Sequence, residues 1–216
     1  DFCLSRGLGD VYKRQGLVDR TTLPSMDDFA RPSLPPRIST LHLVMHSFLY
    51  LASQSPRRQE LLTQLGVRFE LLLPESDENA EAIEAPLPNE NARAYVKRVT
   101  LAKCDAALQR WAKRNLPWAP ILCADTTVSL PNSDTSQILG KPADAADAER
   151  ILRLLSGQTH EVLTAIAVIP QQSTEPISLV QVSEVEFMVL SDPLIEAYIA
   201  SQEPYGKAGA YGIQGL

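Results

Sequence analysis

Apolar and polar positions follow the periods of strands and helices from about residue 49 onward. Short apolar or alternating runs predict strands, and apolar residues three and four positions apart predict amphipathic helices. We expect strands at 49–52, 67–73, 121–130, 161–169 and 177–190, and helices at 56–65, 90–114, 145–155 and 192–201. The last two strands are expected to be antiparallel neighbours across a polar turn. A length of 216 residues is compatible with one α/β domain or two small ones.

The first 44 residues show no such period. They are rich in Pro, Ser, Arg and Gly and have too little apolar surface to build a core. We therefore predict that residues 1–44 are a disordered extension or a non-native leader, and that Met45 is the true start. No uninterrupted apolar run follows basic residues, so a signal peptide is not predicted. The folded domain is expected at residues 45–216.

Two adjacent arginines stand at the start of the first predicted helix. Ser55 is a good N-cap, Pro56 suits the first helical position, and Gly66 ends the helix. Arg57 and Arg58 therefore lie in the first turn, where unpaired backbone N–H groups already favour an anion. Their position indicates either a site for a polyphosphate or carboxylate, or two solvated arginines on an ordinary surface helix.

Charged residues also occur inside two apolar patterns. Lys103 falls within the apolar stripe of the helix at 90–114, so it either extends to the edge of the core or meets an anion in a cleft. Asp125 comes late in the buried strand at 121–130 and is followed by Thr126. A buried carboxylate is costly unless it is paired, hydrogen-bonded or bound to a cation. We interpret it as a carboxylate that holds Mg²⁺ or activates water; the alternative is an aspartate satisfied by neighbouring amides.

The other polar candidates lie in loops. Lys141 belongs to a short, stiff connection and is either a third phosphate contact or an ordinary loop lysine. Glu78 belongs to an acidic segment, and such segments are usually solvated, so a role as a metal ligand needs further support. The end of the chain carries four glycines, which suit tight turns or a close approach of the backbone to a ligand.

The composition excludes several classes of function. A formal net charge of −6 argues against a general nucleic-acid-binding protein, which would usually present a basic face. No apolar run approaches the roughly twenty residues that span a bilayer. The three cysteines have no CxxC spacing and fit a reducing cytosol, and the three histidines have no metal-ligand spacing.

Several short motifs together resemble the Maf family of nucleoside triphosphate pyrophosphatases. They occur in the family's order, cover about 45–216, and are highly specific as a set. The matching pieces are SQSPRRQELL at 53–62, the DE pair at 77–78, YVKR followed by Lys103, ADTTV at 124–128, GKP at 140–142, LSGQTHEVLTA at 155–165 and EPYGKAGAYGIQG at 203–215. Because members of the family continue past the last motif, we expect the domain to be C-terminally incomplete.

The resemblance implies a Maf/ITPase-like α/β fold, with a mixed β-sheet, flanking helices and two lobes around a nucleotide cleft. It implies a cytoplasmic homodimeric hydrolase acting on acid anhydrides, which cleaves a nucleoside triphosphate to the monophosphate and pyrophosphate with Mg²⁺ or Mn²⁺. Neither nucleic acid nor a membrane is an expected partner. Arg57 directly after SP and Gln214 in the last motif resemble members that act on dTTP and UTP in house-cleaning of the nucleotide pool.

The same resemblance assigns roles to individual residues. Asp125 would be the catalytic base or a metal-bound carboxylate, and Glu78 would help to hold the metal. The triphosphate would be bound by Arg58, Lys103 and Lys141, and substrate choice would be shaped by Arg57, Thr126 and Gln214. Attack of water at the α-phosphorus needs neutralisation of phosphate charge more than covalent help, so a cation, a carboxylate and several Arg or Lys donors suit the reaction.

Two alternative functions are considered. One is a non-catalytic nucleotide-binding regulator of cell division, because the family name is linked to septum formation. The other keeps the chemistry but acts on 7-methyl-GTP, although relatives of that type carry a tryptophan after SP. Pyrophosphate release from a panel of nucleotides separates these alternatives from a dTTP/UTP pyrophosphatase.

Overall fold

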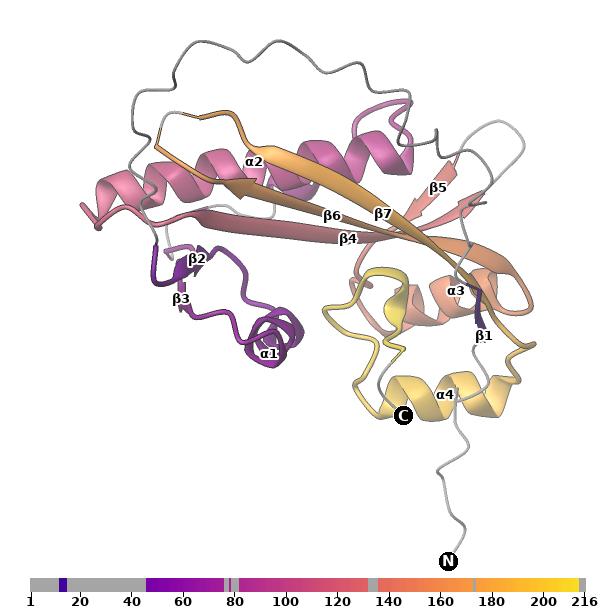
Figure 1. Cartoon of the computed structure of the whole chain (residues 1–216). Helices are drawn as coiled ribbons and strands as arrows, with labels where there is room; N and C mark the ends of the chain where they lie inside the picture. The colour runs from indigo at the N-terminus through magenta and orange to yellow at the C-terminus, as the bar shows by residue number, and fades with distance from the viewer. Residues whose placement is uncertain are drawn as a thin grey trace, which may run out of the picture.

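The computed structural model of the chain describes residues 12–14, 46–75, 78, 82–131, 136–172 and 174–213 (Figure 1). Within the predicted leader, Tyr12–Arg14 forms strand β1, which pairs antiparallel with β7. The rest of residues 1–44, the predicted start at Met45 and the predicted specificity residue Gln214 lie outside the described residues.

The described strands form one mixed sheet. Its order is β1-β7-β6-β4-β2-β3, and β5 pairs with β4 beside this path. Strand β2 is parallel to β3 and β4, whereas the pairs β4–β6, β6–β7 and β4–β5 are antiparallel. The predicted mixed α/β fold and the antiparallel β6–β7 pair are confirmed. The strands are β2 (Leu49–Leu51), β3 (Phe69–Leu71), β4 (Ile121–Pro131), β5 (Ser136–Leu139), β6 (Thr159–Ile169) and β7 (Ile177–Glu186).

Strand β7 is shorter than its apolar pattern predicts. It ends at Glu186 instead of Leu190, because the next backbone groups bond to the turn after α3 (Ala145–Leu155). Gly157 N donates to Met188 O at 3.0 Å, and Leu190 N donates to the Ser156 hydroxyl at 2.7 Å. Phe187 and Leu190 therefore pack in the core cluster that contains residues of α3, without continuing the strand.

The helices lie on both faces of the sheet. Helix α2 (Ala92–Lys113) runs along one face of β4, β6 and β7 (Figure 1). On the other side, α1 (Pro56–Gln64) lies near one end of the sheet, while α3 and α4 (Asp192–Ala200) lie near the other (Figure 1). Asn91 and Asp144 cap α2 and α3 with their side chains, as expected for such residues. No described helix has the length and apolar character needed to cross a membrane.

Strand β4 sends alternate side chains to the two faces. Ile121 and Cys123 pack with α2 residues in one core cluster, whereas Val128 packs with residues of α3 and α4 in another. Asp125 and Thr126 are consecutive, so they also point to opposite faces. The sheet thereby divides the predicted site residues into two groups.

Helix α1 is held to the sheet differently from the other helices. It has no buried residue, and two leucines that its sequence places on one side, Leu61 and Leu65, are 43% and 75% exposed. Its main link to the sheet is polar, since the Arg58 guanidinium donates to the Ala124 carbonyl in β4 at 2.8 Å. The first-turn arginine thus helps to place the helix.

Candidate active site

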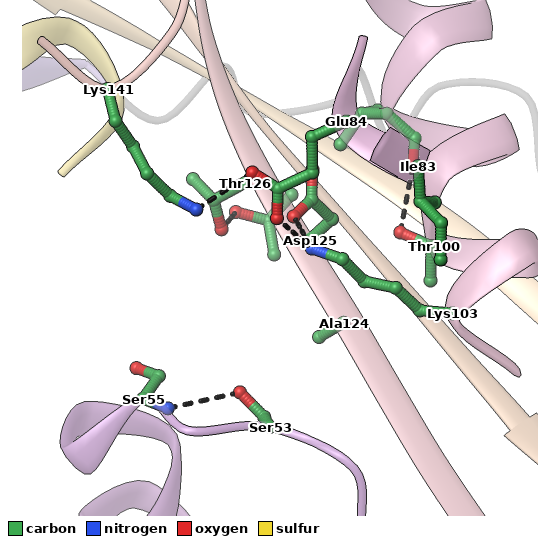
Figure 2. A network of polar contacts seen from close by, with 12 residues as sticks. Ser53, Ser55, Ile83, Glu84, Thr100, Lys103, Ala124, Asp125, Thr126 and Lys141 are labelled. Atoms are coloured by element: carbon green, nitrogen blue, oxygen red, sulfur yellow. Dashed lines mark hydrogen bonds and ion pairs between the residues drawn. The ribbon is translucent and has the colours of Figure 1, made fainter. Parts of the chain in front are cut away.

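Asp125 occupies the middle of β4, opposite Ala165 of β6. The residue is only 8% exposed, so its charge needs a partner. One carboxylate oxygen, Oδ1, accepts a hydrogen bond from Lys103 Nζ at 2.6 Å (Figure 2). The buried aspartate is therefore paired with a cation from the facing helix.

Lys103 links Asp125 to a second carboxylate. Its Nζ also donates to Glu84 Oε1 at 2.8 Å. Burial by itself would lower the pKa of Lys103, but the adjacent carboxylates outweigh that effect and raise its pKa above the ordinary value. The inward lysine is thus a charged group within a polar cluster, and it does not extend to solvent past the core.

Glu84 is the residue of this cluster that the sequence did not reveal. It ends a short 3-10 helix, Ala82–Glu84, in the segment before α2. The Tyr95 hydroxyl donates to the Glu84 carbonyl at 2.8 Å, and Arg98 donates to the next carbonyl, that of Ala85, at 2.9 Å. Burial favours the neutral acid, yet hydrogen bonds from Lys103 and Lys141 leave the pKa of Glu84 below its ordinary value.

Lys141 completes the cluster from the loop after β5. Its Nζ donates to Glu84 Oε2 at 2.8 Å, so one carboxylate binds two lysines (Figure 2). The Lys141 side chain is 52% exposed, compared with 21% for Lys103. Two lysines and two carboxylates, brought from four separate segments, form this cluster, which we call the Asp125 cluster.

Arg58 lies beside the Asp125 cluster on the other side of β4. It donates to Ser53 Oγ at 3.0 Å and, more weakly, to Thr126 Oγ1 at 3.4 Å. The Thr126 hydroxyl is also 3.1 Å from that of Thr164 in β6. Burial lowers the pKa of Arg58, while the charge of Asp125 nearby opposes the shift. The structure therefore brings Arg58 into contact with Thr126, the residue that follows Asp125 in β4.

Three predicted site residues are not found in these groups. Arg57 forms an ion pair with Glu60 on the same helix, and its side chain is 43% exposed. Glu78 accepts two hydrogen bonds from Arg110, which holds the pKa of Glu78 down at about 2. Gln214 lies outside the described residues. Glu84 shares Lys103 with Asp125, whereas Glu78, which was predicted to help to hold the metal, pairs with Arg110.

The cluster suits a divalent cation that is bound jointly by protein carboxylates and by the phosphates of a substrate. Within the described part of the chain, no group of three or more His, Cys, Asp or Glu side chains is placed to hold a metal by itself. Asp125 and Glu84 nevertheless provide two carboxylates bridged by one lysine. Magnesium is commonly bound through one or two carboxylates together with substrate phosphates and water, so these residues fit that ion.

Comparison with known proteins identifies the family. A family model described as Maf-like protein matches residues 48–216, most of the chain. The chain belongs to the Maf family. The range that matches this family contains every residue of the Asp125 cluster as well as Arg58 and Thr126, whereas strand β1 lies outside it.

Several curated proteins are similar to this chain over most of its length. A protein named dTTP/UTP pyrophosphatase from Ralstonia nicotianae is 59% identical over 170 residues, which cover 79% of this chain and 80% of that protein. One of the same name from Albidiferax ferrireducens is 57% identical over 171 residues, covering 79% and 82%. One from Burkholderia pseudomallei is 50% identical over 190 residues, covering 88% and 83%.

Proposed function

We propose that this Maf protein hydrolyses dTTP and UTP to the nucleoside monophosphate and pyrophosphate. The observation that carries the proposal is the Asp125 cluster, in which Lys103 lies between two carboxylates at 2.6 and 2.8 Å. Such a set supplies both the anionic ligands for a cation and the cationic donors for phosphates. The name and the high identity of the curated relatives support the choice of dTTP and UTP.

The lysines bind the triphosphate by exchanging partners. Without substrate, Lys103 and Lys141 are neutralised by Asp125 and Glu84. A polyphosphate offers the same lysines oxygen acceptors of higher charge. When the lysines turn to the phosphate, the two carboxylates lose their partners and become free to bind a cation. Arg58 lies close enough for the charge of Asp125 to raise its pKa, and it provides a further donor for phosphate.

Asp125 is the proposed catalytic residue. Its carboxylate lies among charged groups in a partly buried position, where it can take a proton from water or hold the cation. When bound, Mg²⁺ or Mn²⁺ neutralises phosphate charge as a Lewis acid and lowers the pKa of bound water. Glu84 is proposed as the second carboxylate for this ion, and the role predicted for Glu78 is retained as a competing proposal.

Substrate choice is assigned to residues on the other side of β4 and at the end of the chain. The proposed residues are Arg57, Thr126 and Gln214. Thr126 is supported by its contacts with Arg58 and Thr164, which fix the hydroxyl within a polar group. For Arg57 and Gln214 the support is the match of their motifs to members that act on dTTP and UTP.

We also propose a cytoplasmic homodimer. Buried free thiols at Cys104 and Cys123 suit a reducing compartment. Ile177 and Leu179 of β7 are 69% and 59% exposed and provide apolar surface that a dimer interface could cover. Light scattering coupled to gel filtration measures the mass directly, and a monomer at micromolar concentration would contradict the dimer.

The decisive assay is pyrophosphate release from a panel of nucleoside triphosphates with Mg²⁺ or Mn²⁺. We expect release from dTTP and UTP, little release from the purine nucleotides, and loss of activity after treatment with a chelator. Preference for 7-methyl-GTP would indicate the other type of Maf enzyme. Binding of dTTP without release by a folded protein would support a regulatory role instead.

A further inference from the structure

The sheet has a break along one edge of β4. The last backbone bond from the β2 side joins Ala52 N to the Leu122 carbonyl at 2.9 Å, and β5 begins to pair with β4 only at Val128. In the part of the chain that the structure describes, no strand pairs with residues 123–127 on this side. On the opposite side, β6 pairs with β4 without interruption from Ile121 to Ser129. This stretch of β4 therefore has one paired edge and one open edge.

The backbone groups at the open edge belong to Ala124 and Thr126. Successive residues of an antiparallel strand direct their N–H and C=O groups alternately toward and away from one partner. Leu122 directs its carbonyl to the β2 side and the register with β6 is continuous, so Ala124 and Thr126 also face away from β6. The Ala124 carbonyl accepts from Arg58 at 2.8 Å. Among the described residues, none accepts a hydrogen bond from the Thr126 N–H.

This open edge lies between the two groups of polar residues that the sheet separates. The Asp125 carboxylate and Lys103 are on the face covered by α2, whereas the Arg58 guanidinium and the Ser53 hydroxyl are on the other. Figure 2 shows Ala124 between Ser53 and the Asp125 cluster. A phosphate chain that contacts both groups must therefore cross the edge of β4 at the break.

We propose that the Thr126 backbone N–H donates a hydrogen bond to an oxygen of the reacting phosphate. This inference rests on the proposed pyrophosphatase function. The Ala124 carbonyl and the Thr126 N–H are neighbours along one edge of the strand, so an oxygen bound to this N–H lies beside the Arg58 guanidinium. The N–H also belongs to the peptide unit that joins Asp125 to Thr126. The donor is thereby fixed relative to both the proposed base and a proposed phosphate ligand.

The reaction places charge where such a donor is useful. The oxygen of water bonds to the α-phosphorus while the bond from that phosphorus to the bridging oxygen of the leaving pyrophosphate breaks. Asp125 takes the proton from water, and pyrophosphate leaves with the electron pair of the broken bond. The remaining α-phosphate oxygens carry negative charge throughout. A backbone N–H held by the sheet stabilises this charge without reorganisation during the reaction.

The test removes this N–H without changing a side chain. Thr126→Val keeps the N–H and serves as the reference. Placing 2-hydroxy-3-methylbutanoic acid, the hydroxy acid that matches valine, at position 126 by nonsense suppression in the full chain replaces the N–H with an ester oxygen. For each protein, kcat and KM for dTTP are measured, with circular dichroism as a folding check.

The matched control places the same ester at Val180 of β7. Because Thr126 faces away from β6, the alternation along β6 and β7 directs the Val180 N–H away from β6 as well. At that edge the described strand β1 pairs only with residues 184–186. An ester also weakens the carbonyl of the preceding residue, and in both proteins that carbonyl faces β6. The control therefore reproduces this side effect.

We expect the ester at position 126 to lower kcat/KM about a hundredfold relative to Thr126→Val, as for loss of one oxyanion donor. The ester at position 180 should stay within about threefold of wild type. Equal kcat/KM for the ester and Thr126→Val, or an equal loss at position 180, would overturn the inference.

A second measurement does not depend on turnover. In wild-type protein labelled with ¹⁵N-threonine, the Thr126 amide resonance is assigned by its absence in Thr126→Val, and tripolyphosphate is added with Mg²⁺. We expect the amide proton to move downfield as it bonds to a phosphate oxygen, and an unmoved resonance at saturation would overturn the inference. A wild-type protein that releases no pyrophosphate contradicts the proposed function itself, and the resonance still decides whether this N–H binds phosphate.

Discussion

Lys103 links two carboxylates through a single ammonium group. Its Nζ contacts Asp125 and Glu84, and Glu84 in turn contacts Lys141. The charges are partly buried, where interactions are stronger than in bulk water and an unpaired charge is costly. Mutual neutralisation therefore keeps these charges stable in the proposed site for a polyanion and a cation.

The two candidate metal carboxylates can be separated by matched substitutions. Glu84→Gln should lower kcat for dTTP at least about a hundredfold, because it removes a charge shared by both lysines of the site. Glu78→Gln should leave kcat within about threefold, because the partner of Glu78 is Arg110. Pyrophosphate release measures both effects.

Glu78→Gln should instead act on stability. The loss should be about 1 kcal/mol at pH 7, since the pair with Arg110 is partly open to solvent. Urea unfolding of both variants provides the comparison. A large loss of kcat in Glu78→Gln, with Glu84→Gln unaffected, would restore the assignment made from the sequence.

At the scale of the element, α2 fixes the irregular segment that precedes it. Near its C-terminus, Arg110 donates to the Leu72 carbonyl at 2.7 Å and binds Glu78. Near its N-terminus, Arg98 donates to the Ala85 carbonyl at 2.9 Å and binds Glu90 at 2.6 Å. The helix thus holds the chain on both sides of Glu84 while Lys103 contacts its carboxylate.

Loss of Arg98, which holds the segment after Glu84, should lower activity although Arg98 itself is not proposed to contact the substrate. Arg98→Met is expected to lower kcat/KM for dTTP about tenfold, because small displacements of a charged group at a phosphate site are costly. Arg93→Met, at an exposed position of the same helix, should leave activity unchanged. Steady-state assays with circular dichroism as a folding check measure this. Equal activity in the two variants would show that Arg98 does not place Glu84.

The sequence predicted the elements of this fold better than the segments between them. Strand and helix periods located β4 and α2, and the charges that interrupted those periods, Asp125 and Lys103, proved to contact each other. Glu84 could not be found in this way, because its segment has no period and its position is set by side chains of α2. Arg58 was identified as an unusual cation, but its bond to Ala124, 66 residues away, required the sheet.

At the scale of the whole molecule, three long strands connect the parts of the site. Helix α2 lies along one face of β4, β6 and β7, and α1, α3 and α4 lie on the other (Figure 1). Asp125 faces α2, while Thr126 contacts Arg58 of α1 and Val128 packs with residues of α3 and α4. Strand β4 therefore carries side chains that contact residues of helices on both faces of the sheet.

The folded state should lose stability between pH 6.5 and 5 mainly through His160. Its pKa is lowered to about 4 in the folded protein, so the unfolded chain binds a proton first as the pH falls below the ordinary value of 6.5. The expected loss from pH 7 to pH 5 is about 2 kcal/mol in wild type and less than about 0.5 kcal/mol in His160→Phe. Stability lost through the lowered pKa of Glu78 appears only below about pH 4.5.

Urea unfolding at pH 7, 6 and 5 measures this difference. The comparison is internal, because the wild-type chain and the variant share every other titrating group. Equal slopes with pH in the two proteins would show that another group dominates in this window.

The central claim is that the Asp125 cluster performs the hydrolysis, and Asp125→Asn tests it most directly. The amide keeps the size of the side chain but removes its charge and its ability to accept a proton as a base. We expect kcat for pyrophosphate release from dTTP to fall by about a thousandfold or more, while the Kd for dTTP, measured by calorimetry, changes by less than about threefold. Turnover at the wild-type rate by a folded Asp125→Asn variant would contradict the account.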